Sequence, residues 1–310
     1  MSNTLLYIIT VIIWGSTWLA ITFQLGSVPP ELSVAYRFAL ASLILFAYIA
    51  LRRLPARYSF KQHAFFALQG LFLFSLNYIL VYLAESFLTS GLVAIVFSTI
   101  IVFNVVFGTL FLQNPVRLRV ILGGTIGLLG LALVFWPELS TLDLSSERAV
   151  GLLLAFLATI SASLGNIISA RNQRSELPVI QTNAFGMAYG ALIMFVLALL
   201  RGAPLTFDAS SEYIFSMLYL ALFGSVIAFG TYLTLLGRIG PDRAAYVTVT
   251  FPIIALLLST MFEGLTWTLF QISGVVLVMA GNVIVLRRGD GKQLQLRRSK
   301  HPQVESDAQS

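Results

Sequence analysis

The stretch Asp242–Leu286, DRAAYVTVTFPIIALLLSTMFEGLTWTLFQISGVVLVMAGNVIVL, decides the fold, because a weakened copy of it stands earlier in the chain at Gly91–Phe135. With an offset of 151 residues, ten of the 45 aligned positions are identical. The identities include two glycine pairs, which are Gly123 with Gly274 and Gly130 with Gly281. Each copy holds two apolar runs joined by a short polar break. A half-length repeat in an apolar chain is typical of membrane proteins built from two related halves.

The composition of the chain excludes an aqueous fold. Of its 310 residues, 58% are hydrophobic and only 10% are charged, whereas a soluble domain carries roughly 25% charge. The chain has no cysteine, which excludes disulfides, thiolate metal sites and a cysteine nucleophile. Its two histidines lie in a basic loop (His63) and in the tail (His301), which leaves no buried imidazole for catalysis. We therefore expect a membrane protein without metal or cofactor.

Ten apolar windows are long enough to cross a hydrocarbon layer of ~30 Å. They lie at Leu5–Phe23, Leu32–Leu51, Ala64–Ala84, Gly91–Phe111, Leu118–Trp136, Gly151–Ala170, Asn183–Leu200, Tyr213–Leu236, Ala244–Phe262 and Trp267–Leu286. The first window lacks a basic leader and a cleavage site, so we expect it to remain as a membrane helix rather than act as a signal peptide. The sequence therefore predicts an all-α multi-pass membrane protein with ten transmembrane helices.

The distribution of lysine and arginine predicts the orientation of these helices. If the N-terminus lies inside, the inner segments hold 16 of the 19 basic residues. The outer loops then hold only Arg148 and Arg201, and Arg37 lies within the second helix. This predicts that both termini are cytoplasmic. It also explains the net charge of +6, so we expect the lipid bilayer as a partner and no nucleic acid.

Ten helices divide into two sets of five, and an odd number in each set makes the second set enter the membrane from the opposite side. We predict one five-helix repeat at residues 1–140, an inverted copy at residues 148–288 and a disordered basic tail at residues 289–310. The outer loop Pro137–Val150 is the longest connection and the expected seam.

Ionisable residues at membrane depth are costly and usually functional. Glu85 ends the predicted third helix and Glu263 the ninth, and the orientation places both at the outer interface. Arg37 is the deepest charge. It either extends to the outer headgroups or pairs with Glu31, or it attracts an anionic substrate group. No set of catalytic side chains shares one depth, so an intramembrane enzyme is not expected.

Several predicted helices instead carry neutral polar and aromatic side chains at a similar depth. One such residue alone is better explained as contact between helices or as a bond to its own backbone. Their coincidence in depth predicts a central cavity. The candidates for its lining are Trp14, Trp18, Asn77, Tyr78, Tyr82, Ser163, Asn166, Tyr232, Tyr246 and Thr250. The candidates for gating or coupling are Arg37, Glu85, Glu263 and Pro252, the last as a hinge or a kink in the ninth helix.

With these residues in view, the chain resembles the drug/metabolite transporter superfamily in its ten-helix EamA-type group. The matching motifs are Trp14-Gly15-Ser16, Arg37-Phe38, Ser90-Gly91-Leu92-Val93-Ala94 and the glycine pairs spaced seven residues apart in the fifth and tenth helices. The resemblance covers Leu5–Leu286. It implies export of small metabolites across a bacterial inner membrane and a central cavity made by helices one, three, four, six, eight and nine. The family often has a glutamate after the fourth helix, where this chain has Asn114.

We therefore expect a secondary transporter that exports a small metabolite by alternating access through a central cavity. The resemblance implies an amino acid-like, nucleobase-like or cationic compound, to which the candidate tryptophans and tyrosines would offer an apolar and cation–π surface. Because no buried carboxylate is predicted, we expect downhill export or weak coupling through Glu85 or Glu263. The alternatives are a channel, a non-transporting scaffold and, less favoured, an intramembrane enzyme. The oligomeric state is open, with a monomer as the simplest expectation.

Overall fold

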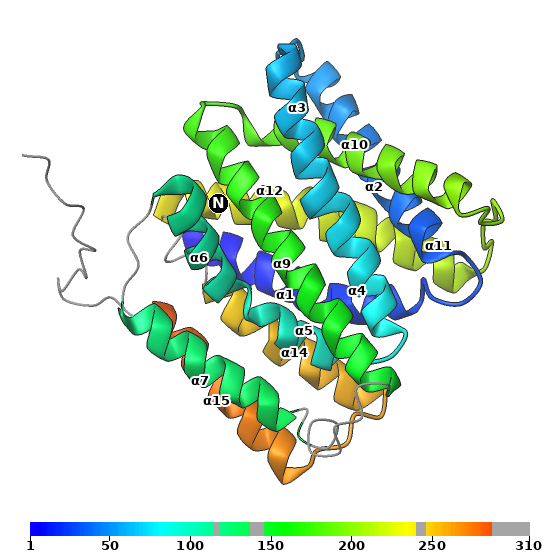
Figure 1. Cartoon of the computed structure of the whole chain (residues 1–310). Helices are drawn as coiled ribbons and strands as arrows, with labels where there is room; N and C mark the ends of the chain where they lie inside the picture. The colour runs from blue at the N-terminus through cyan, green and yellow to red at the C-terminus, as the bar shows by residue number, and fades with distance from the viewer. Residues whose placement is uncertain (114–117, 135, 137–145, 240–245, 287–310) are drawn as a thin grey trace, which may run out of the picture.

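The computed structural model describes residues 1–113, 118–134, 136, 146–239 and 246–286, and all its regular elements are helices (Figure 1). The first half contains α1 (Asn3–Thr22), α2 (Pro30–Leu51), α3 (Phe60–Gln69), η1 (Gly70–Leu76), α4 (Asn77–Glu85), α5 (Ser90–Ser98), α6 (Ile100–Leu112) and α7 (Leu118–Val134). The second half contains α9 (Glu147–Arg174), α10 (Val179–Leu200), α11 (Ser211–Tyr219), η2 (Leu220–Ile227), α12 (Ala228–Ile239), α14 (Tyr246–Phe262) and α15 (Leu269–Leu286).

These elements form ten apolar spans. Seven of them are long and apolar enough to cross a membrane by length and composition. Three shorter apolar helices complete the set, at Ile121–Val134, Thr250–Phe262 and Leu269–Ile284. The third span consists of α3, η1 and α4, the fourth of α5 and α6, and the eighth of α11, η2 and α12. Each predicted window lies on one of these spans, so the all-α multi-span fold is confirmed.

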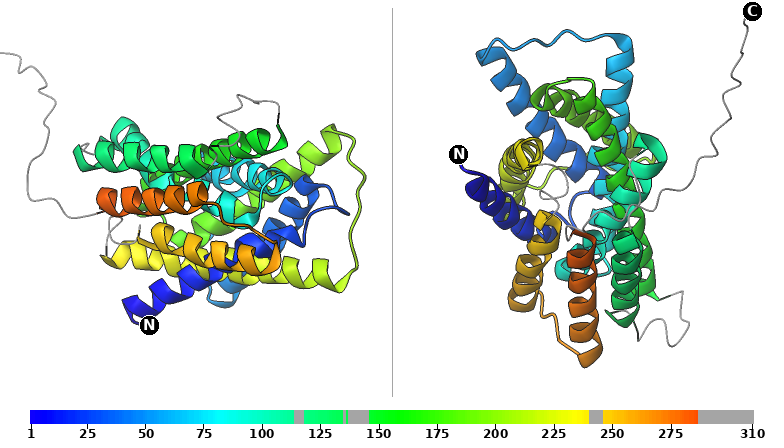
Figure 2. Two further views of the ribbon diagram at one scale, coloured as in Figure 1. Left: turned by 90° about the horizontal axis from the view of Figure 1, so that it is seen from below. Right: turned by 90° about the vertical axis from the view of Figure 1, so that its left-hand side faces the viewer.

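Equivalent helices of the two halves pack against each other. α7 lies along α15 at one edge of the bundle, and α2 lies along α10. The pair α7 and α15 also stays together in the right-hand view of Figure 2. At their crossing, a Cβ on Gly274 would lie 2.5 Å from the carbonyl oxygen of Gly130, and one on Gly281 would meet the carbonyl of Gly123. The glycines that match in the repeat are therefore the ones that contact across it, as expected at a two-fold axis.

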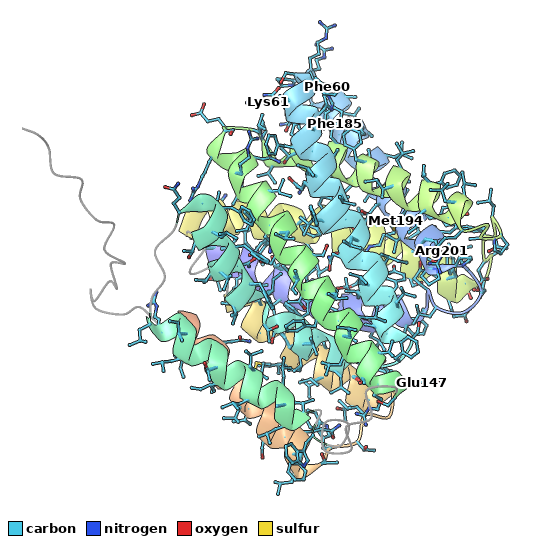
Figure 3. All side chains as sticks on the ribbon, viewed as in Figure 1. Phe60, Lys61, Glu147, Phe185, Met194 and Arg201 are labelled. Atoms are coloured by element: carbon cyan, nitrogen blue, oxygen red, sulfur yellow. The ribbon has the colours of Figure 1, made fainter. Side chains whose placement is uncertain are left out.

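The turns that follow the helices also correspond between the two halves. Six residues of the described chain have positive φ, and they form three pairs offset by 149 to 151 residues, which are Gly26 with Glu176, Arg53 with Gly202 and Gln113 with Gly264. In each pair, the left-handed residue follows the equivalent helix of each half. We call the end of the bundle that carries the three glycines the outer end, after the predicted orientation. In Figure 3, Lys61 and Glu147 lie at opposite ends of the bundle; which end faces the cytoplasm stays a prediction.

The third and eighth spans share a feature that the sequence analysis did not predict. Both contain a π-helical segment, η1 and η2, at equivalent positions in the middle of the span. In each segment, a serine hydroxyl donates to the carbonyl five residues earlier, Ser75 to Gly70 and Ser225 to Leu220, both at 3.0 Å. Such widened turns often occur at functional sites. The side chains that follow them face the centre of the bundle.

Two buried polar clusters tie the helices at opposite ends. At the outer end, the Gln24 amide donates to Ser216 and to the Tyr213 carbonyl, at 2.6 and 2.9 Å, and so joins α1 to α11. At the inner end, Gln69 joins α3 to α9 and α10 through Asn172 and Asn183, both at 3.0 Å. The repeat boundaries themselves stay a prediction, because residues 137–145 of the expected seam and the whole tail from residue 289 lie outside the described residues.

Candidate functional site

A cavity of about 80 Å³ lies in the middle of the bundle. It is bounded by the first, third, fourth, sixth, eighth and ninth spans, which are the six that the resemblance implied. Its lining is mainly aromatic and apolar, and consists of Trp14, Thr17, Trp18, Ile21, Leu73, Asn77, Tyr78, Val81, Phe97, Ile100, Ala162, Asn166, Phe229, Tyr232, Thr248 and Phe251. An apolar pocket with a few polar groups is the usual form of a small-molecule site.

Two indoles of α1 organise the aromatic part of the lining. The centre of the Trp14 ring lies 5.3 Å from the centre of the Phe229 ring and 4.9 Å from that of Tyr232, and both partners are on α12. One turn further along, the Trp18 ring lies 5.2 Å from Phe97 and 5.7 Å from Phe251. These pairs connect α1 to the fourth, eighth and ninth spans. The resulting ring surface suits planar, apolar or cationic groups.

The polar part of the lining includes a buried acceptor without a hydrogen-bond partner. The Asn77 amide donates to the Leu73 carbonyl at 3.3 Å, but its Oδ1 atom has no hydrogen-bond partner. The Asn166 amide makes a long contact of 3.4 Å with Asn104. An unpartnered buried oxygen costs free energy unless a water molecule or a ligand satisfies it. Asn77 therefore brings an unsatisfied acceptor to the wall of the cavity.

Six of the ten candidates for the lining surround this cavity, namely Trp14, Trp18, Asn77, Tyr78, Asn166 and Tyr232. The structure places three others elsewhere. Tyr82 is fully buried, Ser163 donates to Asn104 at 2.8 Å, and Thr250 bonds the Tyr7 hydroxyl at 2.5 Å. The side chain of Tyr246 lies outside the described residues. That the six bind a solute stays a prediction.

The lining also includes Phe97, Phe251 and Thr248, which no pattern in the sequence predicted. The two phenylalanines lie in uninterrupted apolar runs, where an aromatic side chain gives no signal of its own. Only the pairing of α1 with α5 and α14 places them opposite Trp18.

The expectations for Arg37 as a headgroup contact or a partner of Glu31 are wrong. Arg37 is 1% exposed, and Glu31 binds Arg201 at 3.1 Å instead. Six residues apart on a helix, Glu31 and Arg37 face different sides of α2. The Arg37 Nε atom donates to Ser225 Oγ at 3.1 Å, and its guanidinium carbon lies 4.5 Å from the centre of the Tyr78 ring. Arg37 therefore lies directly behind the cavity wall.

The expectation that no carboxylate is buried is also wrong. Glu85 is only 7% exposed, and neither of its carboxyl oxygens has a hydrogen-bond partner. Glu263, in contrast, accepts hydrogen bonds from the backbone N–H of Ser90 at 3.0 Å and from its hydroxyl. Pro252 lies inside α14, which continues on both sides of it. Whether Pro252 acts as a hinge stays a prediction.

No group of three or more histidine, aspartate or glutamate side chains within the described part of the chain could hold a metal ion.

A model of the EamA-like transporter family matches this chain twice, over residues 1–136 and again over residues 149–287. The chain belongs to the EamA-like transporter family. Membership of the EamA-like transporter family makes it a multi-pass membrane transporter rather than an enzyme, and the two matched segments correspond to the two halves of the bundle.

Named relatives of this EamA-like transporter cover nearly its whole length. It is 30% identical over 284 residues to the uncharacterized inner membrane transporter YedA of Escherichia coli strain K12, over 88% of this chain and 89% of that one. It is 25% identical over 294 residues to a protein of Salmonella typhimurium named "Probable amino-acid metabolite efflux pump", over 89% and 92% of the two chains. It is also 27% identical to the Salmonella typhimurium protein PagO, over 85% and 86% of the two chains.

A solved crystal structure shares the fold of this EamA-like transporter. The two chains superpose with a TM-score of 0.66 at 18% identity, over 92% of this chain and 96% of the other. At that identity, the likeness concerns the fold alone.

Proposed function

We propose that this protein exports a small amino acid-like metabolite across the bacterial inner membrane by alternating access at the aromatic cavity. The single observation that carries the proposal is the position of the cavity. Three spans of the first half and three of the second enclose it. A relative movement of the helices on its two sides would therefore change which face of the membrane it opens to.

We propose two moving bodies that each combine both halves and that stay packed against each other where α2 lies along α10 and where α14 lies against α5. The first body consists of α1, α2, the eighth span and α14. Within it, Thr10 bonds Thr231 at 2.8 Å and Tyr7 bonds Thr250. The second body consists of the third and fourth spans, α9 and α10. Within it, Ser163 bonds Asn104, and the Ser161 hydroxyl donates to the Phe72 carbonyl at 2.8 Å. The cavity lies between the two bodies, so we propose that these two bodies rock around it.

The size of the cavity supports a conformational cycle. Its volume of about 80 Å³ holds a few water molecules, whereas small-molecule sites usually enclose roughly 300–1,000 Å³. The present conformation therefore encloses too little space for a metabolite. We propose that the cavity widens when one end of the bundle opens and contracts to this form when both ends approach closure.

The chemistry of the lining supports the substrate class. Trp14, Trp18 and their partner rings offer a surface for an apolar or aromatic side chain. The Asn77 Oδ1 atom accepts a hydrogen bond from an amino group, and the nearby charge of Arg37 attracts a carboxylate. The efflux-pump name of the Salmonella relative favours the same class over nucleobase-like and cationic compounds.

The four tryptophans of the chain allow a matched test. In proteoliposomes loaded with a mixture of labelled amino acids, we expect Trp14→Ala to slow efflux at least tenfold, because the substitution removes the ring contacts to Phe229 and Tyr232. Trp267→Ala is the control, since this indole is 41% exposed and lies away from the cavity. Equal efflux from both variants would contradict the assignment of the site.

A channel is the alternative mechanism, and its signature differs. A channel would give stepwise single-channel currents in planar bilayers for a permeant charged solute. We expect no such steps, together with efflux that saturates as the solute concentration rises.

A further inference from the structure

A carboxylate clamp joins the two moving bodies at the outer end. Glu263 follows the last residue of α14 in the first body, and its carboxylate accepts the backbone N–H and the hydroxyl of Ser90 in the second body. Ser90 is the first residue of α5, so the charge also lies at the positive end of a helix of nine residues. The Glu263 carboxyl group therefore has two hydrogen bonds and lies at a helix N-terminus.

A second carboxyl group lies close to this clamp and has none of those interactions. Glu85 is the last residue of α4, is 7% exposed, and has two oxygens without a hydrogen-bond partner. Both carboxyl groups lie at the outer end, because Glu263 follows α14, which packs against α5, and α5 in turn contacts α4, which ends at Glu85. Burying a second, unpartnered negative charge beside the first is costly. Protonation of Glu85 removes that cost.

The other titratable groups on the helices around Glu85 do not replace the missing partner. Tyr78 and Tyr82 share its own helix, and α2 contributes Arg37. Glu263 follows α14, α9 begins with Glu147 and Arg148, and Tyr7 of α1 lies towards the other end of the bundle. α5 contains no titratable residue. Arg37 is held by Ser225 and the Tyr78 ring and makes no hydrogen bond to Glu85.

Closure of the outer end also buries other polar atoms without hydrogen-bond partners. A Cβ on Gly91 of α5 would lie 2.8 Å from the Ser259 Cβ atom and 3.0 Å from the Leu256 Cα atom of α14, so the two helices are in backbone contact. The hydroxyls of Ser259 and Thr89 are buried there without partners. Separation of α5 from α14 would hydrate these hydroxyls and Glu85 together. The closed outer end is therefore held by the clamp and opposed by the unpartnered groups behind it.

We propose that Glu85 is a proton-binding site, separate from the cavity, which keeps the outer end of the transporter closed while the proton is bound. When the outer end opens, Glu85 becomes hydrated, releases its proton and is free to ionise. The closed form therefore holds one proton more than the open form. By linkage, the ratio of open to closed molecules changes up to about tenfold for each pH unit in the range where only one form is protonated. The site does not depend on which solute is carried.

The absence of native cysteine makes the gate directly measurable. Ser259→Cys places a thiol of similar size at a buried position whose hydroxyl has no partner. The exposed Ser211→Cys, near the same end, corrects for the increase in thiolate with pH. In lipid nanodiscs, we expect the maleimide labelling rate of Ser259→Cys, divided by that of Ser211→Cys, to rise with pH by up to about tenfold per unit.

Substituting Glu85 and Glu263 one at a time distinguishes the role of the proton-binding site from that of the clamp. Glu85→Gln imitates the protonated form, so we expect the labelling ratio to stay low at every pH. Glu263→Gln weakens the clamp, so we expect the ratio to be higher than in the parent protein at every pH. A ratio that is independent of pH in the parent, or one that still rises with pH in Glu85→Gln, would overturn the proposal.

An infrared measurement tests the same claim on protein without introduced cysteine. We expect the native chain at neutral pH to show the C=O stretching band of a protonated carboxylic acid and to lose it on alkaline titration. The band should weaken in Glu263→Gln, in which the outer end opens more often, and vanish in Glu85→Gln. If Glu85 is instead ionised and balanced by Arg37, the native chain will show no such band, and the proposal fails whether or not the cysteine variants fold.

Discussion

At the scale of single residues, Ser225 has a double role. Its hydroxyl donates to the Leu220 carbonyl within η2 and accepts the Arg37 Nε–H. Ser75 is its counterpart in η1, but it bonds only the neutral carbonyls of Gly70 and Leu71. The two serines occupy equivalent positions, so they make a matched pair for measuring what a buried guanidinium requires.

We expect Ser225→Ala to lower the free energy of unfolding by about 1.5–3 kcal/mol, because it leaves a charged donor without a partner. Ser75→Ala should cost about 1 kcal/mol or less, because only neutral bonds are lost. Both values can be measured by SDS titration in mixed micelles. Equal losses would show that the Arg37 bond adds nothing to stability.

A residue outside the membrane gives a pH prediction. The Asp208 carboxylate accepts the Ser27 hydroxyl at 2.6 Å and the Ser210 backbone N–H at 2.8 Å. These bonds lower the pKa of Asp208 from its ordinary value. The contact between the two outer turns is therefore complete above that ordinary value and is lost as the pH falls through the lowered one.

Carbon-13 NMR of labelled aspartate would follow this titration. We expect Ser27→Ala to move the pKa of Asp208 back towards its ordinary value, since the largest cause of the shift is removed. Ser211→Ala is the control, because its hydroxyl bonds Glu212 instead. An unchanged titration in Ser27→Ala would show that this bond does not persist in solution.

At the scale of elements, the crossing of α7 and α15 depends on backbone contact. A Cβ on Gly274 would lie 2.5 Å from the Gly130 carbonyl oxygen and 2.7 Å from the Val134 nitrogen. Backbone atoms cannot move aside as the end of a flexible side chain can. Gly127 lies in the same helix pair, yet a Cβ there would meet nothing within 4 Å.

We therefore expect Gly274→Ala to cost about 1–3 kcal/mol through overpacking. Gly127→Ala should be neutral or slightly stabilising, because alanine favours the helix by about 1 kcal/mol over glycine. Thermal melting in detergent would separate the two variants. Similar melting temperatures would mean that α7 and α15 are not packed this closely.

The π-helical segments also belong to this scale, and no pattern in the sequence predicted them. A widened turn adds one residue to the helix and shifts the faces on either side of it. Asn77, Tyr78 and Tyr82 all lie in α4, after η1, so the widened turn sets the direction of this face as a whole and does not separate the three residues. In the structure, Asn77 and Tyr78 line the cavity and Tyr82 does not.

At the scale of the whole molecule, the prediction that remains to be measured is the orientation. We expect a green fluorescent protein fused after Leu286 to fluoresce, because both termini are predicted to be cytoplasmic. Alkaline phosphatase inserted between Gly202 and Phe207 should be active, because that turn lies at the predicted outer end. Activity in the opposite pattern would reverse the proposed direction of the gate.

The sequence predicted the ten spans, because apolar length and charge distribution depend on local composition. It also predicted that Trp14 and Asn77 face the centre, since a polar side chain facing lipid at mid-depth is unfavourable and tryptophan otherwise prefers the membrane interface. It failed for Arg37 and Glu85, because depth alone does not say which side of a helix faces the bundle. It missed Phe97 and Phe251, whose role depends on which helices are neighbours.

The paired left-handed turns indicate where a substitution would make the protein more stable. Three of the six positions are already glycine, whereas Arg53, Gln113 and Glu176 hold a side chain where the backbone disfavours one. Replacing Glu176 with glycine would relieve that local strain far from both the cavity and the gate. It would also remove a negative charge from the inner end of the bundle, where most of the basic residues are predicted to lie. Gly26, the counterpart of Glu176 in the first half, already has glycine at this turn, so Glu176→Gly would make the two turns alike.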